Sequence, residues 1–299
     1  MLASLTLIAA SFAPAADPSA TLADRLDTLA AAHKGKVAIA LKNFGCGETY
    51  FRNADEVMPT ASLIKLAVMA EVYAQSEAGK VKLDDMVTLK KDDQVPGSGI
   101  LTDHFSPGAS FSLRDAVHLM IVYSDNTATN LVLDKIGIKP VNERMAGLGL
   151  KETRINAKVF KGSTTSVDPA RTKKYGLGST TAREMLTLLE LLHKGELVSA
   201  DASKAMLEHL KKCDDKDKFP RFLPKGVTTA HKTGSVNEAR TDAGLIFFKD
   251  GPVALVVLTN QNDDKSWTPD NAGNKLCADI ARAVVEHYQA AAKKDTPKK

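Results

Sequence analysis

The pattern of apolar positions predicts a helix and two strands at the start of the chain. Leu22, Leu26 and Leu29 recur at the spacing of one helix face. Residues 36–41 alternate in part, with apolar residues that favour strands, and a glycine-rich turn separates them from a possible returning strand at residues 49–52. This opening therefore predicts one helix followed by paired strands.

A long helical stretch follows. Residues 62–74 form a nearly continuous apolar run, which predicts a buried helix. Ser112, with Asp115 three residues later, resembles a capping box at the start of another helix. Further helices are predicted over residues 126–136 and 185–193.

The pattern then returns to strands, predicted over residues 228–232, 243–249 and 253–259, and ends with a helix over residues 271–289. Strands, then helices, then strands again are typical of an α+β protein whose antiparallel sheet is interrupted by an all-helical insertion. A cleft is expected at the seam between the two parts.

This pattern predicts a specific division of the chain. We expect an α/β domain from residues 20–60 together with 215–290 and an all-α domain from residues 61–214. Residues 1–16 combine a short apolar run with an Ala-x-Ala-like site, which predicts a signal peptide and an exported, periplasmic or secreted protein. Residues 291–299 are rich in lysine and are predicted to form a disordered basic tail.

Composition limits the partners. The 299 residues include 40 basic and 36 acidic side chains, a formal charge of +4, much of it in the C-terminal lysines. No basic stripe with interleaved aromatic residues is present, so we expect no nucleic-acid partner. Outside the N-terminus no apolar run is long enough for a membrane span. A monomer acting on a small molecule is the simplest expectation.

The cysteines and histidines predict neither a metal site nor a cofactor. Cys46, Cys213 and Cys277 are an odd number at wide spacing, so at most one pair forms and three unpaired thiols fit as well. His231 is expected to pack beside a strand. The Asp/Lys run at residues 211–218 is expected to be a solvated hinge.

The first candidate motif is Ser62-Leu-Ile-Lys65. A hydroxyl is a poor nucleophile until a base removes its proton, and residues i and i+3 share a helix face. Lys65 can be that base if burial or a nearby cation lowers its pKa. The helix start also offers backbone N–H groups to an oxyanion at Ser62. The alternative is an ordinary helix cap followed by a lysine that reaches solvent.

The second motif is Ser124-Asp125-Asn126, between two predicted helices. Ser124 can pass a proton to a leaving amine, and Asn126 carries both a donor and an acceptor for a substrate amide. All three residues are also good helix caps, so an interhelical cap is the alternative, and Asp125 is expected to be structural in either case.

The third motif is Lys232-Thr233-Gly234, at the end of a predicted strand. The lysine and threonine side chains suit a substrate carboxylate, and Gly234 allows close backbone approach. The N–H of Ser235 is a candidate second oxyanion donor. A strand that simply ends in a turn is the alternative.

Together, these three motifs resemble the class A β-lactamases and penicillin-binding proteins, where the same three occur in this order. The resemblance extends from about Leu22 to Tyr288 and includes residues 96–101, 119–131 and 238–244. It implies a five-stranded antiparallel sheet flanked by helices, with an inserted all-helical domain, and a serine hydrolase that acts on cyclic amides.

The resemblance also implies roles for individual residues. Ser62 attacks the lactam carbonyl with help from Lys65, while Ser124 and Lys232 handle the proton and the charge of the departing nitrogen. It also implies that Asn126 and Thr233 position the substrate's side-chain amide and carboxylate, and that Arg240 adds a second positive charge for the carboxylate.

One family feature is missing. Class A enzymes deacylate with a glutamate on a loop after the second motif, and here Val159 or Phe160 stands at that position. Glu152 comes too early, and Asp168 lies in a stretch that does not align. The usual Arg–Asp clamp of the loop is not visible either. We therefore predict acylation with slow deacylation, unless Asp168 or another group supplies the base.

Two other functions fit the same motifs. A D-Ala-D-Ala peptidase or esterase acting on a peptidoglycan-like substrate needs no loop glutamate. A non-catalytic penicillin-binding sensor would have lost its serine or lysine, yet Ser62, Lys65, Ser124 and Lys232 are all present.

Overall fold

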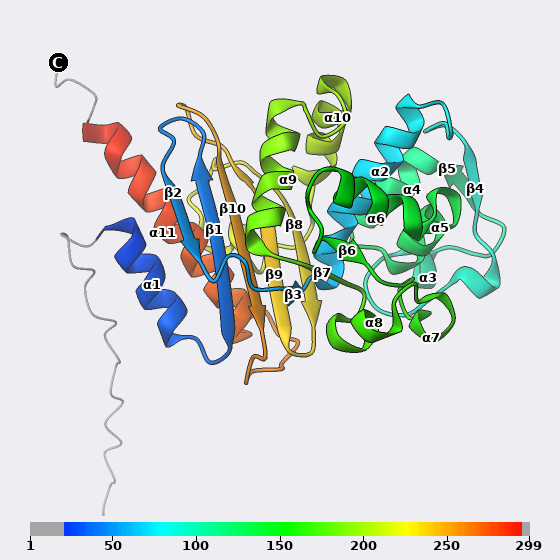
Figure 1. The fold of residues 1–299 in the computed structure, drawn as a ribbon, viewed down its shortest axis with the longest axis horizontal. Helices are drawn as coiled ribbons and strands as arrows, with labels where there is room; N and C mark the ends of the chain where they lie inside the picture. The colour runs from blue at the N-terminus through cyan, green and yellow to red at the C-terminus, as the bar shows by residue number, and fades with distance from the viewer. Residues whose placement is uncertain (1–20, 295–299) are drawn as a thin grey trace, which may run out of the picture.

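The computed structural model describes residues 21–294, so the predicted signal peptide at residues 1–16 lies outside the described part. A central sheet separates two helices on one side from most of the helices on the other (Figure 1). No helix in the described residues is long and apolar enough to cross a membrane.

The predicted five-stranded antiparallel sheet is confirmed. Both ends of the chain contribute strands, so segments far apart in sequence pair directly. The spatial order is β2 (Thr49–Arg52), β1 (Lys36–Asn43), β10 (Val253–Asn260), β9 (Ala239–Ile246) and β8 (Thr229–Val236).

Strand β10 shows why the central strands read as continuous apolar runs. Val253, Leu255 and Val257 belong to the core shared with α1 (Leu22–Ala32) and α11 (Ala272–Lys294). The alternate residues of β10 belong to the core on the opposite face, against which α9 (Ala182–Lys194) packs. Because both faces are covered, apolar residues are needed at every position rather than at every second one.

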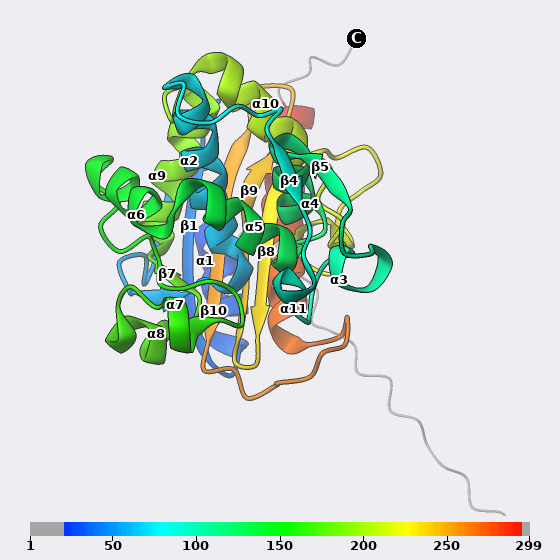
Figure 2. The same ribbon diagram turned by 90° about the vertical axis from the view of Figure 1, so that its right-hand side faces the viewer.

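The helical part surrounds α2 (Lys65–Glu77), which is buried over nearly its whole length. This burial explains the uninterrupted apolar run predicted there. Figure 2, which views the molecule from this side, shows α5 (Asn126–Ile136) in front of β8. The helices of this part are α4 (Leu113–Val122), α5 (Asn126–Ile136), α6 (Ile138–Gly147), α9 (Ala182–Lys194) and α10 (Ala200–Leu210).

Short elements connect these parts. They are β3 (Met58–Pro59), η1 (Ala61–Ile64), β4 (Met86–Thr88), η2 (Lys91–Asp93), α3 (Leu101–His104), β5 (Ser110–Ser112), β6 (Arg154–Ile155), α7 (Gly162–Thr165), α8 (Pro169–Tyr175), β7 (Gly178–Thr180) and η3 (Phe219–Phe222). The predicted cap at Ser112 is present, because its Oγ accepts from the N–H of Asp115 at 3.1 Å.

Three expectations need correction. The strand predicted to end at Lys232 continues to Val236, because Gly234 packs closely against the neighbouring η1 turn instead of ending the strand. Helix α11 continues to Lys294, so residues 291–294 are helical, while residues 295–299 lie outside the described part. The 211–218 segment is not simply solvated, since Lys218 is 2% exposed.

Candidate active site

Ser62 lies in the 3₁₀ turn η1, immediately before α2. The α-helix predicted from Ser62 therefore begins only at Lys65, after a tighter first turn. Ala61, directly before the serine, has φ +47°, a backbone conformation that non-glycine residues adopt at a cost. Ser62 is partly exposed and lines two adjoining cavities of about 370 and 630 Å³.

Lys65 is fully buried, and its ammonium nitrogen contacts the second motif. Nζ lies 2.7 Å from the Ser124 carbonyl oxygen, 3.0 Å from Asn126 Oδ1 and 3.3 Å from Ser124 Oγ. The first two oxygens only accept hydrogen bonds, so they take two N–H groups of the lysine. A neutral amine in this place keeps its lone pair for a hydroxyl.

The charge on Lys65 is disfavoured by its surroundings. Burial lowers the pKa of Lys65 well below its ordinary value, and the nearby Lys232 cation lowers it further, against a smaller opposing effect of Asp125. Lys65 is therefore a desolvated amine beside another cation, which is the condition under which a lysine can act as a base.

Ser124 joins both lysines. It lies between α4 and α5 with φ +53°, and its Oγ accepts a hydrogen bond from Lys232 Nζ at 3.0 Å. This strained backbone is held by Asp125, whose carboxylate caps α5 at Ala128 and accepts from the N–H groups of Ile100 and Leu101. Asp125 is 1% exposed and its position is structural.

Strand β8 brings the third motif to the serine. A Cβ on Gly234 would lie 2.4 Å from the Thr60 carbonyl oxygen, so only glycine allows the strand to pack so tightly against η1. Ser235 consequently lines both cavities together with Ser62. Lys232 is buried beside them, and burial lowers its pKa.

The expected substrate-binding residues divide between the two cavities. Thr233 lines the smaller cavity with Lys232, and Asn126 lines the larger one. Asn126 Nδ2 donates to the Pro96 carbonyl at 3.0 Å, which fixes the amide so that its oxygen faces Lys65.

Arg240 does not fit its expected role. It lies on β9, is 1% exposed and lines neither cavity. Its guanidinium donates to the backbone carbonyls of Ala239 and Ser266, at 2.9 and 2.6 Å, and to that of Val236. It lies 4.9 Å from the ring centroid of Trp267. These contacts tie the turn between β8 and β9 to the loop after β10, and they leave the Arg240 guanidinium turned away from the cavities where a substrate carboxylate would bind.

The loop after β6 carries apolar side chains at the positions where the family resemblance places a glutamate. Val159 and Phe160 both line the larger cavity with Ser62. Asn130 fixes this segment, because its Oδ1 accepts from Val159 N at 2.8 Å and its Nδ2 donates to Val159 O at 3.0 Å. Phe160 is 67% exposed with φ +55°. Residues 156–167 contain no carboxylate.

Asp168, the alternative base, lies elsewhere. Its Oδ1 accepts from Arg171 N at 3.0 Å, so it caps α8 and lines neither cavity. The carboxylates that do line the cavities with Ser62 are Asp214, Asp215 and Glu238. Of these, Asp215 pairs with Lys218 at 2.7 Å and Glu238 with Lys265 at 2.6 Å. None belongs to the loop.

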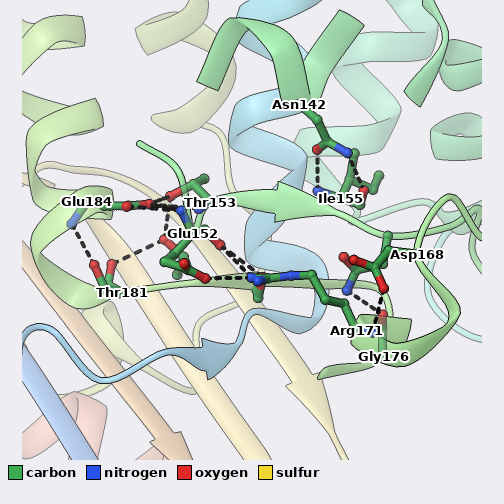
Figure 3. Close-up of polar contacts among 12 residues, drawn as sticks. Asn142, Glu152, Thr153, Ile155, Asp168, Arg171, Gly176, Thr181 and Glu184 are labelled. Atoms are coloured by element: carbon green, nitrogen blue, oxygen red, sulfur yellow. Dashed lines mark hydrogen bonds and ion pairs between the residues drawn. The ribbon is translucent and has the colours of Figure 1, made fainter. Parts of the chain in front are cut away.

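The loop does have a clamp, although sequence reasoning missed it. Arg171 Nη2 pairs with Glu152 Oε2 at 2.8 Å and donates to Ser179 Oγ at 2.6 Å (Figure 3). Asn156 Nδ2 donates to the Gly176 carbonyl at 3.0 Å across the neck of the loop. This clamp pairs a glutamate with an arginine that follows it in the sequence, so it differs from the Arg–Asp pair that the resemblance implies.

No group of three or more histidine, cysteine, aspartate or glutamate side chains in residues 21–294 is placed to hold a metal ion. The three cysteines are unpaired, which settles the alternatives that their odd number left open.

Comparison with known proteins agrees with this geometry. A family model described as the Beta-lactamase enzyme family matches residues 21–288. A β-lactamase from Proteus vulgaris is 28% identical over 267 residues, covering 85% of this chain and 84% of the relative.

Solved structures give the same result. A β-lactamase from Sphaerobacter thermophilus has a TM-score of 0.77 and 29% identity, over 92% of this chain and 98% of that one. The structure of PBP-A has a TM-score of 0.77 and 26% identity, over 91% of this chain and 96% of that one. A PBP-A mutant was solved as an acyl-enzyme complex with penicillin-G. The chain therefore belongs to the beta-lactamase enzyme family.

Proposed function

We propose that the chain is a serine hydrolase that β-lactams acylate at Ser62 and that releases the acyl group slowly. The observation that carries this proposal is the buried contact of Lys65 with Ser124 and Asn126 beside residues 156–167, which contain no carboxylate. The family indicates the reaction class, and the contacts within this chain support the proposed roles of the residues.

In the first half-reaction the neutral amine of Lys65 takes the proton of the Ser62 hydroxyl, and Oγ forms a bond to the lactam carbonyl carbon. The N–H groups of Ser62 and Ser235 stabilise the oxyanion. As the carbon–nitrogen bond breaks, Ser124 gives its proton to the nitrogen and recovers one from Lys65. Lys232, 3.0 Å from Ser124 Oγ, favours the anionic groups of the substrate.

The second half-reaction needs a base for water. A positioned general base contributes about 10² to 10⁴ in rate. Val159 and Phe160 offer none, and Asp168 caps α8 away from both cavities. Acylation is therefore expected to be faster than hydrolysis of the acyl-enzyme.

Intact-protein mass spectrometry after mixing with benzylpenicillin tests this directly. We expect the mass of the protein to rise by that of one penicillin molecule and the adduct to persist after excess drug is removed. Rapid, complete turnover without an adduct would show that a base operates which the geometry does not reveal.

A second candidate is a D-Ala-D-Ala peptidase or esterase with the same machinery, and the absent carboxylate favours it over a rapid lactamase. Comparing turnover of nitrocefin with that of an acyl-D-Ala-D-Ala peptide separates the two. A sensor without catalysis would show no adduct on Ser62 with any lactam or ester.

We also propose that the protein is exported and acts as a monomer. The support for export is the apolar run and Ala-x-Ala-like site in residues 1–16. N-terminal sequencing of the protein recovered outside the cytoplasm tests export, and light scattering tests whether the protein is a monomer.

A further inference from the structure

Large apolar side chains are exposed in the larger cavity that Ser62 lines, although the proposed mechanism does not use them. Phe160 and Trp267 are each 67% exposed, and Val236 is 43% exposed. All three line the 630 Å³ cavity, and they come from the loop after β6, the loop after β10 and the end of β8. Apolar surface gathered around one concave site is typical of a ligand pocket.

Phe160 is held in this cavity against its local backbone preference. Its φ of +55° is an outlier for a bulky residue, and such a conformation persists only where the surrounding structure fixes it. The fixing contacts are the two hydrogen bonds between the Asn130 amide and the backbone of Val159. The ring lies against Gly97, where a Cβ would be 3.3 Å from Phe160 Cε2 and 2.8 Å from Asn126 Nδ2. The ring and the Asn126 amide therefore flank the same glycine in the wall of the cavity.

Trp267 is supported by Arg240, which itself lines neither cavity. The Arg240 guanidinium lies 4.9 Å from the ring centroid of Trp267 and donates to the Ser266 carbonyl at 2.6 Å. The arginine packs against the start of α11, since a Cβ on Gly273 would lie 2.8 Å from Arg240 Cγ. Asp264 accepts from the N–H of Ser266 at 2.9 Å and so fixes the backbone next to the indole. The exposed tryptophan is therefore presented on a firm support.

The charges of the larger cavity favour a neutral occupant. Within the described part of the chain, the charged residues that line this cavity are Lys158, Lys174 and Glu238. Lys158 forms an ion pair with Asp134, and Glu238 pairs with Lys265 at 2.6 Å. Lys174 is exposed and lies over an aromatic ring, 5.0 Å from its centroid. Because partners within the protein neutralise two of these charges, an apolar group fits the cavity better than a charged one.

We propose that Phe160 and Trp267 are specificity-determining residues, that Arg240 is the residue that positions the Trp267 indole, and that together they select substrates whose acyl amide carries an aromatic ring. This inference rests on the proposed acylation of Ser62. With the substrate amide at Asn126, the acyl group extends into the larger cavity, where Phe160 and Trp267 contact an aryl ring. Aromatic pairs stabilise a complex beyond the apolar area that they bury, so both contributions favour an aryl group.

The first test compares penicillins that share one nucleus and differ in the acyl group. Acylation of Ser62 is timed with benzylpenicillin, which carries a phenylacetyl group, and with the 6-acetamido analogue, which lacks the ring. We expect benzylpenicillin to acylate at least about tenfold faster, which is the lower end of what one methylene group contributes in an apolar pocket. Equal rates would overturn the proposal, as would faster acylation by a penicillin whose acyl group carries a carboxylate in place of the ring.

Substitutions assign the preference to the two rings. In Trp267→Ala and in Phe160→Ala the ratio of the two acylation rates is expected to fall by about tenfold, because benzylpenicillin loses a contact that the acetamido analogue never makes. Trp267→Phe keeps an aromatic ring and should retain most of the ratio. Phe105→Ala is the matched control, since Phe105 is 39% exposed and lines neither cavity. A wild-type ratio in both alanine variants of the cavity, or an equal loss in Phe105→Ala, would refute the assignment.

The positioning role of Arg240 is read from tryptophan fluorescence, because Trp267 is the one tryptophan in the sequence. Arg240→Gln removes the cation beside the indole, so we expect a shifted emission spectrum together with a lower ratio of the two acylation rates. Arg240→Lys keeps a cation and should lie between the glutamine variant and the wild type. Wild-type emission with a wild-type ratio in both variants would contradict the role. If Arg240→Gln unfolds, which circular dichroism reports, Arg240→Lys decides alone.

Fluorescence also separates this inference from the proposed function. N-phenylacetylglycine carries the same aryl amide without a lactam, so it tests recognition of the ring in the absence of acylation. We expect it to change the emission of Trp267 saturably, whereas N-acetylglycine does not, and equal responses to the two compounds would overturn the aromatic subsite. If neither penicillin acylates the protein, the proposed function fails, and this titration still decides whether the cavity selects an aromatic ring.

Discussion

Restoring a carboxylate to the loop should convert slow release into turnover. Val159→Glu places an acid in the cavity that Ser62 lines, at a backbone position whose N–H donates to Asn130 Oδ1 at 2.8 Å and whose carbonyl accepts from Asn130 Nδ2 at 3.0 Å. Because these bonds involve only the backbone of residue 159, the substitution leaves the anchor of the loop intact.

The expected gain follows from the value of a positioned base. Deacylation should accelerate by about 10² to 10⁴, which corresponds to lowering its barrier by about 3 to 5 kcal/mol. The stability of the folded protein should fall, because Val159 is 9% exposed and loses about 2 kcal/mol of apolar burial. The new carboxylate also pays for partial desolvation, which raises its pKa.

The assay is the lifetime of the penicillin adduct by intact-protein mass spectrometry, together with steady-state hydrolysis of nitrocefin. Val159→Gln is the matched control, since it has nearly the same size and cannot act as a base. Equal adduct lifetimes in the glutamate and glutamine variants would refute the reasoning, as would a wild-type protein that already turns over as fast as the glutamate variant.

Three further predictions concern single groups. Lys65→Arg replaces the lysine by a cation that stays protonated, so acylation measured by stopped-flow mixing should slow by about 10² to 10⁴. In the wild type the acylation rate should fall as the pH drops through the lowered pKa of Lys65, and a pH-independent rate would contradict this role. Gly234→Ala places a Cβ 2.4 Å from the Thr60 carbonyl, so urea denaturation should show a loss of about 1 to 3 kcal/mol, and wild-type stability would count against this packing. Burial lowers the pKa of His209 to about 4, so at intermediate pH the unfolded chain binds a proton that the folded chain does not. The stability that the folded protein has above about pH 6.5 is therefore lost as the pH falls towards about 4. His209→Gln should remove about 1 kcal/mol of that loss, and identical pH dependence in both proteins would disprove the reasoning.

Much of the fold was predictable because its signals are local. The apolar periodicity located α1, α2, α5 and β10, and the Ser112 cap marked the start of α4. The prediction ended β8 too early because glycine usually weakens a strand, whereas Gly234 is required there by the close approach of Thr60. That requirement comes from a residue far away in sequence, so the strand alone does not reveal it.

The fold brings close together most of the residues that the sequence offered for the candidate site. Ser62, Lys65, Ser124 and Lys232 form a recognisable set, and the structure brings them around one cavity or into hydrogen-bond contact. Arg240 was assigned by resemblance, but its guanidinium donates to the backbone carbonyls of Val236, Ala239 and Ser266, which only the folded chain brings together. The Glu152–Arg171 clamp escaped notice because its members are separated by a loop of unfamiliar sequence.

The buried charges near β8 were the least predictable part. The run at residues 211–218 looks like a solvated linker, since its composition is nearly all charged. In the folded chain Lys218 pairs with Asp215, and Cys213 is 1% exposed. Such contacts depend on how the end of α10 returns to the edge strand, which no local pattern encodes.

The most direct test of the central claim is to locate the penicillin adduct by peptide mass spectrometry in the wild type and in Ser62→Ala. The account predicts that the wild-type adduct maps to Ser62 and that the alanine variant, folded by circular dichroism, carries none. An adduct on another residue, or unimpaired lactam hydrolysis by the alanine variant, would contradict it.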